Sequence, residues 1–169
     1  MRKNILSFLM IFILLSCNKK TENKLDIESS NKKPKTEIDA SIALQFLNDY
    51  TELSNKIILK KSDINIEEWI KKSTSVTEDF KNSYETLIKD AEKEDPELSL
   101  DFDPIFDAQD YPEKGFEVSK IDNEDNYITF KSKDSNEFLL NIKVKLTNKK
   151  WLVDGAGIIN IPQNKRIKR

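Results

Sequence analysis

The strongest constraint on the fold is a change of hydrophobic period near Gly115. Before this residue, apolar side chains recur every three or four positions, which is the spacing of a helix with one buried face. After it they alternate with polar side chains, as in strands that bury one face. The helices therefore precede the strands, and this order predicts an α+β fold in which N-terminal helices pack on a curved antiparallel sheet.

Three helical segments are expected in the first half of the chain. The first begins after Asp39, its expected N-cap, and its stripe consists of Ile42, Phe46, Tyr50, Leu53 and Ile57. A short second helix is expected over residues 66–72, with Trp69 and Ile70 turned inward. The third is expected over about 75–94, with a stripe of Val76, Phe80, Tyr84, Leu87 and Ala91.

An antiparallel meander is expected beyond Gly115. The alternating positions are Phe116 and Val118, then 127–130, then Phe138, Leu140, Ile142, Val144 and Leu146, and finally Trp151 and Val153. Turn residues fall at 122–125, 133–136 and 148–149, between these runs. Gly155-Ala156-Gly157 is expected to bend the chain into a last apolar segment, 158–161.

The N-terminus has the pattern of a secretory signal. Arg2 and Lys3 precede an apolar run over 5–15, which is about half the roughly 20 residues that span a bilayer. Leu14-Leu15-Ser16-Cys17 resembles a bacterial lipoprotein signal, and this resemblance implies cleavage before Cys17 and lipidation of its thiol. The alternative is an ordinary signal peptide in which the cysteine is coincidental.

The chain divides accordingly into four parts. Residues 1–16 are the expected lipoprotein signal peptide, 17–38 the lipidated cysteine and a flexible tether, 39–162 a single α+β domain and 163–169 a basic tail. Cys17 is the only cysteine, so the domain is expected to have no disulfide. By resemblance to enteric sorting, Asn18 rather than aspartate after Cys17 favours the outer membrane, on either face.

Charge is high but balanced, with 28 basic and 30 acidic side chains and a net charge of −2. Nucleic-acid binding requires a strongly basic face, so no nucleic-acid partner is expected. The expected partners are the lipid bilayer, through acylated Cys17, and an envelope protein or small ligand. The basic tail is expected to be a solvated end rather than a contact with anionic lipid or a partner.

The chain contains no histidine, which excludes Ser-His-Asp and Cys-His catalysis. Its densest acidic stretch carries Asp101, Asp103, Asp107 and Asp110. Calcium binding there is one alternative, but the spacing differs from the twelve-residue calcium loop. Asp103 before Pro104 instead predicts the start of a single helical turn through Gln109. No metal or cofactor is therefore assigned.

Two carboxylates remain as candidates for a hydrolytic pair or a general base: Asp110 and Asp154, each at the end of an element. Trp151 and Tyr111, with Trp69, Phe106 and Tyr127, are candidates to line a ligand pocket, although such aromatics more often belong to the core. Asp110, Asp154, Trp151 and Tyr111 are thus the candidate ligand-binding residues, and no catalytic residue is assigned.

Three motifs carry a resemblance that covers residues 39–162: Phe46-Leu47-Asn48-Asp49-Tyr50, the Asp103 to Asp110 segment, and Trp151-Leu152-Val153-Asp154-Gly155-Ala156-Gly157. They resemble a family of secreted bacterial proteins and lipoproteins without an assigned activity. The fold implied is the cystatin-like or nuclear-transport-factor-2-like cone, in which a long first helix crosses a bent sheet. This architecture serves unrelated functions and implies none by itself.

The expected function is that of a membrane-anchored envelope lipoprotein with a noncatalytic domain that binds a ligand or protein. One alternative is an immunity-type inhibitor of a secreted toxin. Another is a carboxylate-based enzyme that uses a pocket between the helices and the sheet.

Overall fold

The computed structural model describes residues 36–97, 99–135 and 137–168. The helices are α1 (Ser41–Ile58), α2 (Ile66–Lys72) and α3 (Glu78–Glu94), and the strands are β1 (Phe116–Asp122), β2 (Tyr127–Ser132), β3 (Leu139–Thr147) and β4 (Lys150–Ala156). A 3-10 turn, η1 (Gln163–Lys165), follows. The predicted α+β class is confirmed. The predicted signal peptide and Cys17 lie outside the described residues.

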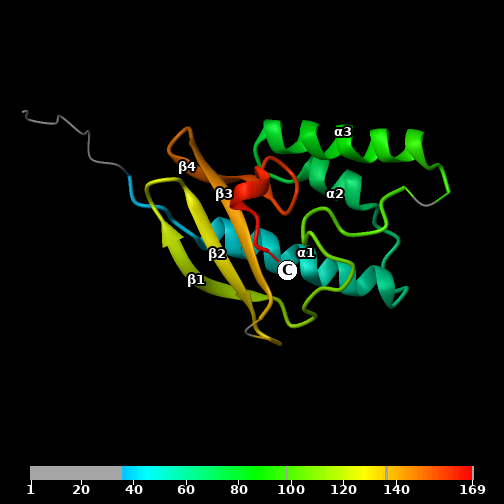
Figure 1. Ribbon diagram of the computed structural model, residues 1–169, viewed down its shortest axis with the longest axis horizontal. Helices are drawn as coiled ribbons and strands as arrows, with labels where there is room; N and C mark the ends of the chain where they lie inside the picture. Colours follow the sequence, from blue (N-terminus) through cyan, green and yellow to red (C-terminus); the bar gives the residue numbers. More distant parts are fainter. Residues whose placement is uncertain (1–35, 98, 136, 169) are drawn as a thin grey trace, which may run out of the picture. The chain divides into compact units, whose positions relative to one another are not determined.

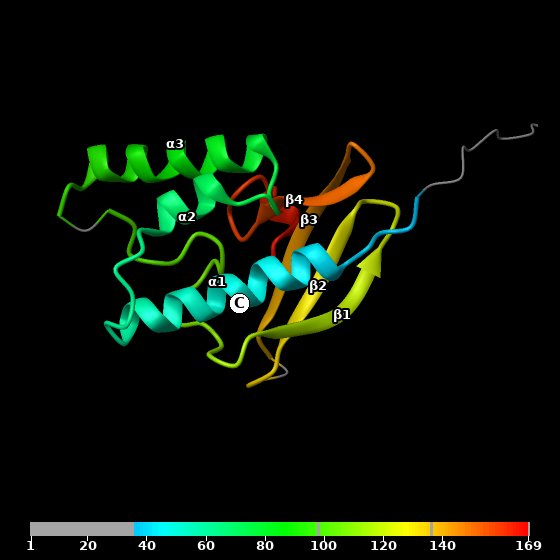
Figure 2. The same cartoon turned by 180° about the vertical axis from the view of Figure 1, so that it is seen from behind.

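The sheet is an antiparallel meander in the order β1-β2-β3-β4. α1 crosses one face of it, whereas α2 and α3 lie beside α1, beyond the strands (Figures 1 and 2). Side chains alternate along β2 and β3, so that Ile128, Phe130, Leu140 and Ile142 are buried beneath the helical layer. The sequence period therefore identified the strands and the buried face of β2 and of most of β3 correctly. The predicted alternation was wrong at Val118 and Leu146, which are exposed because they lie where the sheet extends beyond the helical layer.

The core lies between α1 and the sheet. Of the predicted α1 stripe, Phe46, Tyr50 and Leu53 are buried, whereas Ile42 and Ile57 are only half-buried. Four residues of α1 outside the predicted stripe are also buried, namely Ala43, Leu47, Thr51 and Ser54. The buried band is wider than one stripe because α1 contacts the sheet on one side and the aromatic residues of α2 and α3 on the other.

The third helix begins later than predicted. Its N-cap is Thr77, whose hydroxyl accepts a hydrogen bond from the Phe80 amide at 3.1 Å. The preceding residue, Val76, is extended and forms a parallel bridge with Val153 of β4. Placing Val76 on the helical stripe was therefore wrong. Val76 is buried because it pairs with the sheet, but its spacing from Phe80 is also the spacing of a helical stripe. The helical period alone therefore could not separate this extended residue from the helix that follows it.

The other two helix starts lie close to their predicted positions. α2 has the predicted bounds and is capped by Asn65, which accepts from the Glu68 amide at 3.1 Å. α1 begins after Ala40, one residue later than expected, and the Asp39 carboxylate still accepts from the Ser41 amide at 2.9 Å. That hydrogen bond lowers the pKa of Asp39.

The bend after β4 is the tightest point of the backbone. Gly157 has φ +55°, and a Cβ at this position would lie 2.2 Å from the carbonyl oxygen of Pro104. The bend lets Ile159 bridge back to Ala156, and the Ile158 amide donates to the Pro104 carbonyl at 3.0 Å. Only glycine fits this close approach. The predicted bend is confirmed, and it joins β4 to the acidic segment.

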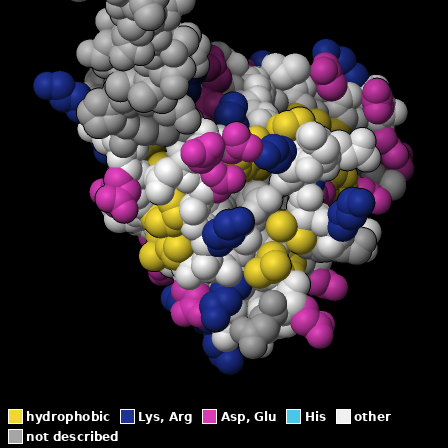
Figure 3. Space-filling view, turned by 60° about the vertical axis from the view of Figure 1, so that its left-hand side comes forward, with side chains coloured by type: hydrophobic (Ala, Val, Ile, Leu, Met, Phe, Trp, Pro, Cys, Tyr) yellow, Lys and Arg dark blue, Asp and Glu magenta, His cyan; other side chains and the backbone are white. Residues whose placement is uncertain are grey.

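The C-terminal residues return to the sheet on the face opposite α1. The Asn141 side chain in β3 donates to the Lys165 carbonyl at 2.7 Å, and Arg166 Nε donates to the Ile161 carbonyl at 2.9 Å. Lys165 also forms an ion pair with Asp125 and lies over the Tyr127 ring. The prediction of a solvated basic tail was therefore wrong for Lys165 and Arg166, because hydrogen bonds to the sheet and to the segment after β4 hold them on the domain. On the face drawn in Figure 3, cationic and anionic side chains are interspersed.

Candidate functional site

The acidic segment folds as a tight turn. Asp103 and Ala108 form an antiparallel bridge that closes it, so the predicted helical turn through Gln109 was wrong. Asp103 does cap the turn, because its Oδ1 accepts from the amides of Ile105 and Phe106, each at 2.8 Å. The capping signal was thus read correctly, but Asp107 adopts φ +54° and turns the backbone away from a helix.

The carboxylate of Asp103 is largely enclosed by the core. Its Oδ2 accepts a hydrogen bond of 2.6 Å from the Tyr50 hydroxyl. Burial raises the pKa of Asp103, while the hydrogen bonds from Tyr50 and the two amides oppose that rise. Burial, followed by the charge of Asp103, raises the pKa of Tyr50, Tyr84 and Tyr111. Asp103 is therefore a structural acceptor that connects the turn to α1.

Two adjoining hollows lie on either side of the segment that follows this turn. One, of about 440 Å³, lies between this segment and the β2–β3 turn, and the other, of about 410 Å³, lies between it and the end of α1. Both are lined by Asp110, Tyr111, Glu113 and Lys114. We call residues 110–114 the binding segment. The first hollow also reaches Phe138, and the second reaches Ile58 and Leu59.

Tyr111 is the centre of this arrangement. Its ring stacks on the buried Phe106 at 4.7 Å, with the two planes 13° apart. Its hydroxyl is buried and has no hydrogen-bond partner among the described residues. An unpaired buried hydroxyl costs about 1–3 kcal/mol. This oxygen has almost no solvent-exposed surface, so a ligand group would recover that cost only after the Tyr111 side chain or the atoms that cover it move.

The charges around Tyr111 are mixed. Lys114 lies 3.4 Å from the Asp134 carboxylate, and its amide donates to Asp134 at 2.8 Å, which holds the binding segment against the β2–β3 turn. On the other side, the Asn55 side chain of α1 donates to the Glu113 carbonyl at 2.9 Å. Asp110 is exposed. The segment is therefore anchored at both sides and presents the exposed Asp110 carboxylate to the hollows.

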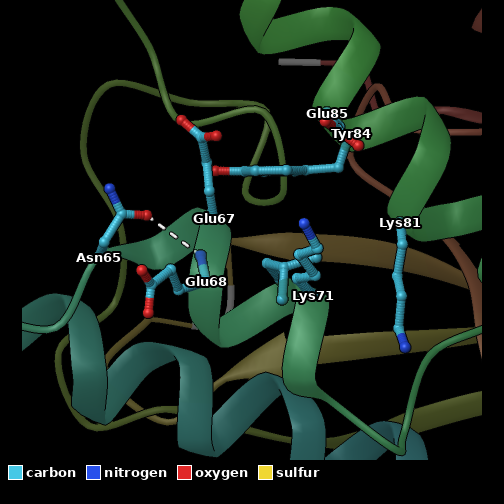
Figure 4. A pocket seen from close by; sticks show the side chains of 8 residues that line it. Asn65, Glu67, Glu68, Lys71, Lys81, Tyr84 and Glu85 are labelled. Atoms are coloured by element: carbon cyan, nitrogen blue, oxygen red, sulfur yellow. Dashed lines mark hydrogen bonds between the residues drawn. The ribbon is translucent and has the colours of Figure 1, made fainter.

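A further hollow, of about 300 Å³, lies between α2 and α3 (Figure 4). The Tyr84 ring extends across it, and its hydroxyl lies toward Glu67 (Figure 4). The charges of Asp103 and Glu67 add to burial in raising the pKa of Tyr84, so this hydroxyl stays protonated. Three of the other charged residues that line the hollow form ion pairs along their own helices: Glu68 with Lys72, Lys81 with Glu78, and Glu85 with Lys89. These pairs leave little free charge for a ligand.

Asp154 has a different environment from Asp110. It sits at the bulge where β3 and β4 shift register, and its side chain is only 7% exposed. Its Oδ2 pairs with Lys143 Nζ at 2.8 Å, and its Oδ1 accepts from the Thr77 hydroxyl at 2.9 Å. Since Thr77 caps α3, Asp154 connects the sheet to the start of that helix. The structure does not bring Asp154 to the hollows beside Asp110.

The predicted aromatic candidates also separate. Trp151 is buried on the core side of β4, and its indole N–H donates to the Glu37 carbonyl at 3.0 Å. Trp69 packs against Phe46 and Tyr50. Of the four candidate ligand-binding residues, Asp110 and Tyr111 thus lie together at the hollows, whereas Trp151 and Asp154 take part in packing.

Sequence reasoning missed the contribution of α1 to this region. Ile58 and Leu59 follow the end of the predicted stripe, and their nearness to Tyr111 has no local signal. It also missed the Tyr50–Asp103 hydrogen bond, because Tyr50 was assigned only to the apolar stripe. A tyrosine on a buried face needs a partner for its hydroxyl, and that requirement was the available signal.

Comparison with protein-family models, with curated proteins and with solved structures finds no match to this chain. Within residues 36–168, apart from 98 and 136, no helix is long and apolar enough to cross a membrane. In the same part of the chain, no three acidic side chains gather closely enough to hold a metal ion. The site must therefore be interpreted from its own geometry.

Proposed function

We propose that this chain is an envelope lipoprotein, anchored through acylated Cys17, whose domain binds a protein or small ligand at the binding segment. The observation that carries the binding function is Tyr111, which lines two adjoining hollows and has a buried hydroxyl with no partner among the described residues. The fitting ligand has an apolar body that lies against Tyr111 and a hydrogen-bonding group that reaches its hydroxyl once the atoms covering it move. We assign it no cofactor.

Binding is favoured over catalysis by the engagement of the carboxylates. Asp154 is paired with Lys143 and Thr77, and Asp103 accepts three hydrogen bonds. A hydrolytic pair requires two carboxylates that face one reacting bond, and Asp110 stands apart from Asp154. An immunity-type inhibitor would use the same exposed segment, so it is one form of the proposed binding function.

The finer fold assignment and the location are part of the same proposal. A long α1 across a four-stranded antiparallel meander supports the cystatin-like or nuclear-transport-factor-2-like cone. Two register shifts, at Val118/Lys120 and at Lys143/Val144, would supply the bending such a cone needs. The Leu14 to Cys17 signal supports the lipid anchor, and Asn18 favours the outer membrane.

The anchor is tested by the variant Cys17→Ser. The wild-type protein should fractionate with membranes and carry acyl chains by intact mass. The variant should lose both properties, since two or more acyl chains are needed for durable binding. A Cys17→Ser protein that remains acylated and membrane-bound would refute the anchor.

The binding function is tested with the native lipoprotein solubilised from envelopes. Tyr111→Ala should abolish recovery of the partner, and Tyr111→Phe should weaken it about three- to ten-fold through loss of one hydrogen bond. Tyr127→Ala is the matched control, because Tyr127 lines neither hollow. Equal recovery by wild type, Tyr111→Ala and Tyr127→Ala would refute binding at this segment.

A further inference from the structure

We propose that the end of α1 docks onto the surface of the bilayer that holds the lipid anchor. The three most exposed large aliphatic side chains of the described residues lie here: Ile58 is 67% exposed, Leu59 60% and Ile64 53%. We call residues 58–64 the apical loop. Clustered exposed aliphatics mark an interaction surface, and the chain itself indicates which one.

The apical loop begins at the C-terminus of α1, where backbone hydrogen bonds cap the helix. Lys60 has φ +53°, its amide donates to the Ile57 carbonyl at 2.9 Å, and the Lys61 amide donates to the Lys56 carbonyl at 2.8 Å. This pair of bonds is the Schellman arrangement that terminates a helix firmly. Ile58 and Leu59 are therefore held outward at a fixed position and cannot be covered by a small local rearrangement.

The charges of the loop suit the headgroup region of a bilayer. Lys60 and Lys61 adjoin the aliphatic residues, and neither forms an ion pair within the described part of the chain. Their long side chains can reach lipid phosphates while the aliphatic groups insert. Asp63 in the loop, and Asp110 and Glu113 beside it, offset this positive charge. Insertion of the aliphatic side chains, not net charge, therefore provides most of the affinity.

The length of the chain before the domain favours the bilayer as the surface that the apical loop contacts. This inference rests on the proposed anchor at Cys17. The 18 residues of α1 extend about 27 Å from the first helical residue to the apical loop. If the segment before the domain is the flexible tether of the proposed anchor, its 19 residues from 18 to 36 would have a root-mean-square span of about 22–26 Å. Effective concentration is greatest when a linker's span matches the distance it must cover. The anchor thus favours a pose in which α1 points toward the membrane.

Docking also gives the binding segment a location. Ile58 and Leu59 line the same hollow as Tyr111, so insertion of the apical loop places that hollow at the membrane surface. Interfacial apolar groups insert about 5–10 Å into the headgroup and acyl boundary. A partner that binds at Tyr111 would then be one that is itself held at the membrane.

The test uses the absence of any other cysteine in the chain. The lipidated protein carrying Leu59→Cys is labelled with an environment-sensitive maleimide dye and placed, one per disc, in nanodiscs of phosphatidylethanolamine and phosphatidylglycerol. The matched control is Lys150→Cys, at the start of β4 and at the other end of the domain (Figure 1). We expect a blue shift and quenching by nitroxide lipid at position 59 and neither at 150.

A second measurement adds Ile58→Ser and Ile64→Ser to the Leu59→Cys protein. These exposed substitutions leave the core intact, and each should lower the docked-to-undocked ratio roughly ten-fold. An unchanged dye environment in this variant overturns the proposal. So does a shift that occurs only in native envelope fragments, which would indicate a protein partner, or only with several proteins per disc, which would indicate self-association.

Maleimide labelling of the wild-type protein distinguishes failure of the proposed anchor from failure of the proposed docking. If Cys17 is acylated, wild type takes up no maleimide and its intact mass includes the acyl chains, whereas a chain cleaved beyond Cys17 takes up none and carries no acyl chain, which also refutes the anchor. Labelling of wild type refutes the anchor and the docking argument together. An unlabelled, acylated wild type with no shift at position 59 leaves the anchor standing and overturns the docking alone.

Discussion

The hydrogen bond between Tyr50 and Asp103 makes the stability of this domain dependent on pH in a predictable way. The perturbation is Tyr50→Phe, which removes one hydroxyl from a fully buried ring and opens no cavity. The lost bond is 2.6 Å long and its acceptor is a buried carboxylate, so the expected loss at neutral pH is about 1.5–3 kcal/mol. At about 2.1 cal/mol/K per residue over roughly 130 residues, that corresponds to a Tm decrease of about 5–11 °C.

The pH dependence follows from the direction of the Asp103 shift. Burial raises the folded-state pKa of Asp103 above its ordinary value of 3.8, and the Tyr50 hydrogen bond limits that rise. The stability contributed by a group with a raised pKa is fully present below its unfolded-state pKa and is lost as the pH rises through the folded-state pKa. Without the Tyr50 hydroxyl the pKa rises further and more stability is lost. The difference between wild type and Tyr50→Phe should therefore grow from about pH 4 toward neutral pH.

Urea unfolding followed by tryptophan fluorescence, at about pH 4 and about pH 7, measures both quantities. Tyr127→Phe is the control, because Tyr127 lies on the face opposite α1 beneath Lys165, and its removal should leave both curves unchanged. A Tyr50→Phe loss below about 0.5 kcal/mol, or one equal at both pH values, would refute the assignment of Asp103 as the acceptor whose raised pKa is limited by the Tyr50 hydroxyl.

Three further substitutions test the packing and the site. Gly157→Ala places a methyl group 2.2 Å from the Pro104 carbonyl at positive φ, and should cost about 3 kcal/mol or more in thermal unfolding; a change under about 1 kcal/mol would contradict this close approach. Asp154→Ala removes the acceptor shared by Lys143 and the α3 cap, and should cost about 2–3 kcal/mol in urea unfolding, whereas an unchanged midpoint would deny it that role. Tyr111→Phe removes a buried hydroxyl without a partner, so stability should stay the same or rise by up to about 1 kcal/mol; a clear loss would reveal a hydrogen bond that binds this hydroxyl.

Local features of the sequence were sufficient to identify most elements of the fold. The helical period identified α1 and α2, and the alternation beyond Gly115 identified the strands and their turns. Asp39 and Asp103 were predicted where side-chain oxygens accept backbone amides. These signals depend on neighbours within a few positions, and a chain expresses them before it has any tertiary contact.

The candidate site could be predicted only in part. Asp110 and Tyr111 were identified because an acidic and an aromatic residue adjoin at the end of an element. Their hollows also require the end of α1 and the β2–β3 turn, which lie far away in the sequence. No spacing rule connects such segments, so the contribution of Ile58 and the separation of Asp154 from Asp110 could not be predicted.

The sequence by itself therefore determined most of the buried positions and where the chain turns, and it is the whole basis of the proposed lipid anchor at Cys17. The tertiary structure decided which buried polar groups meet. Tyr50 hydrogen-bonds to Asp103, which is 53 positions later in the sequence, and Thr77 hydrogen-bonds to Asp154, which is 77 positions later. The physical reason is that the period of apolar residues specifies only which side chains are buried on folding. The partner of each polar group depends on which elements pack together, and that choice is made by the whole core.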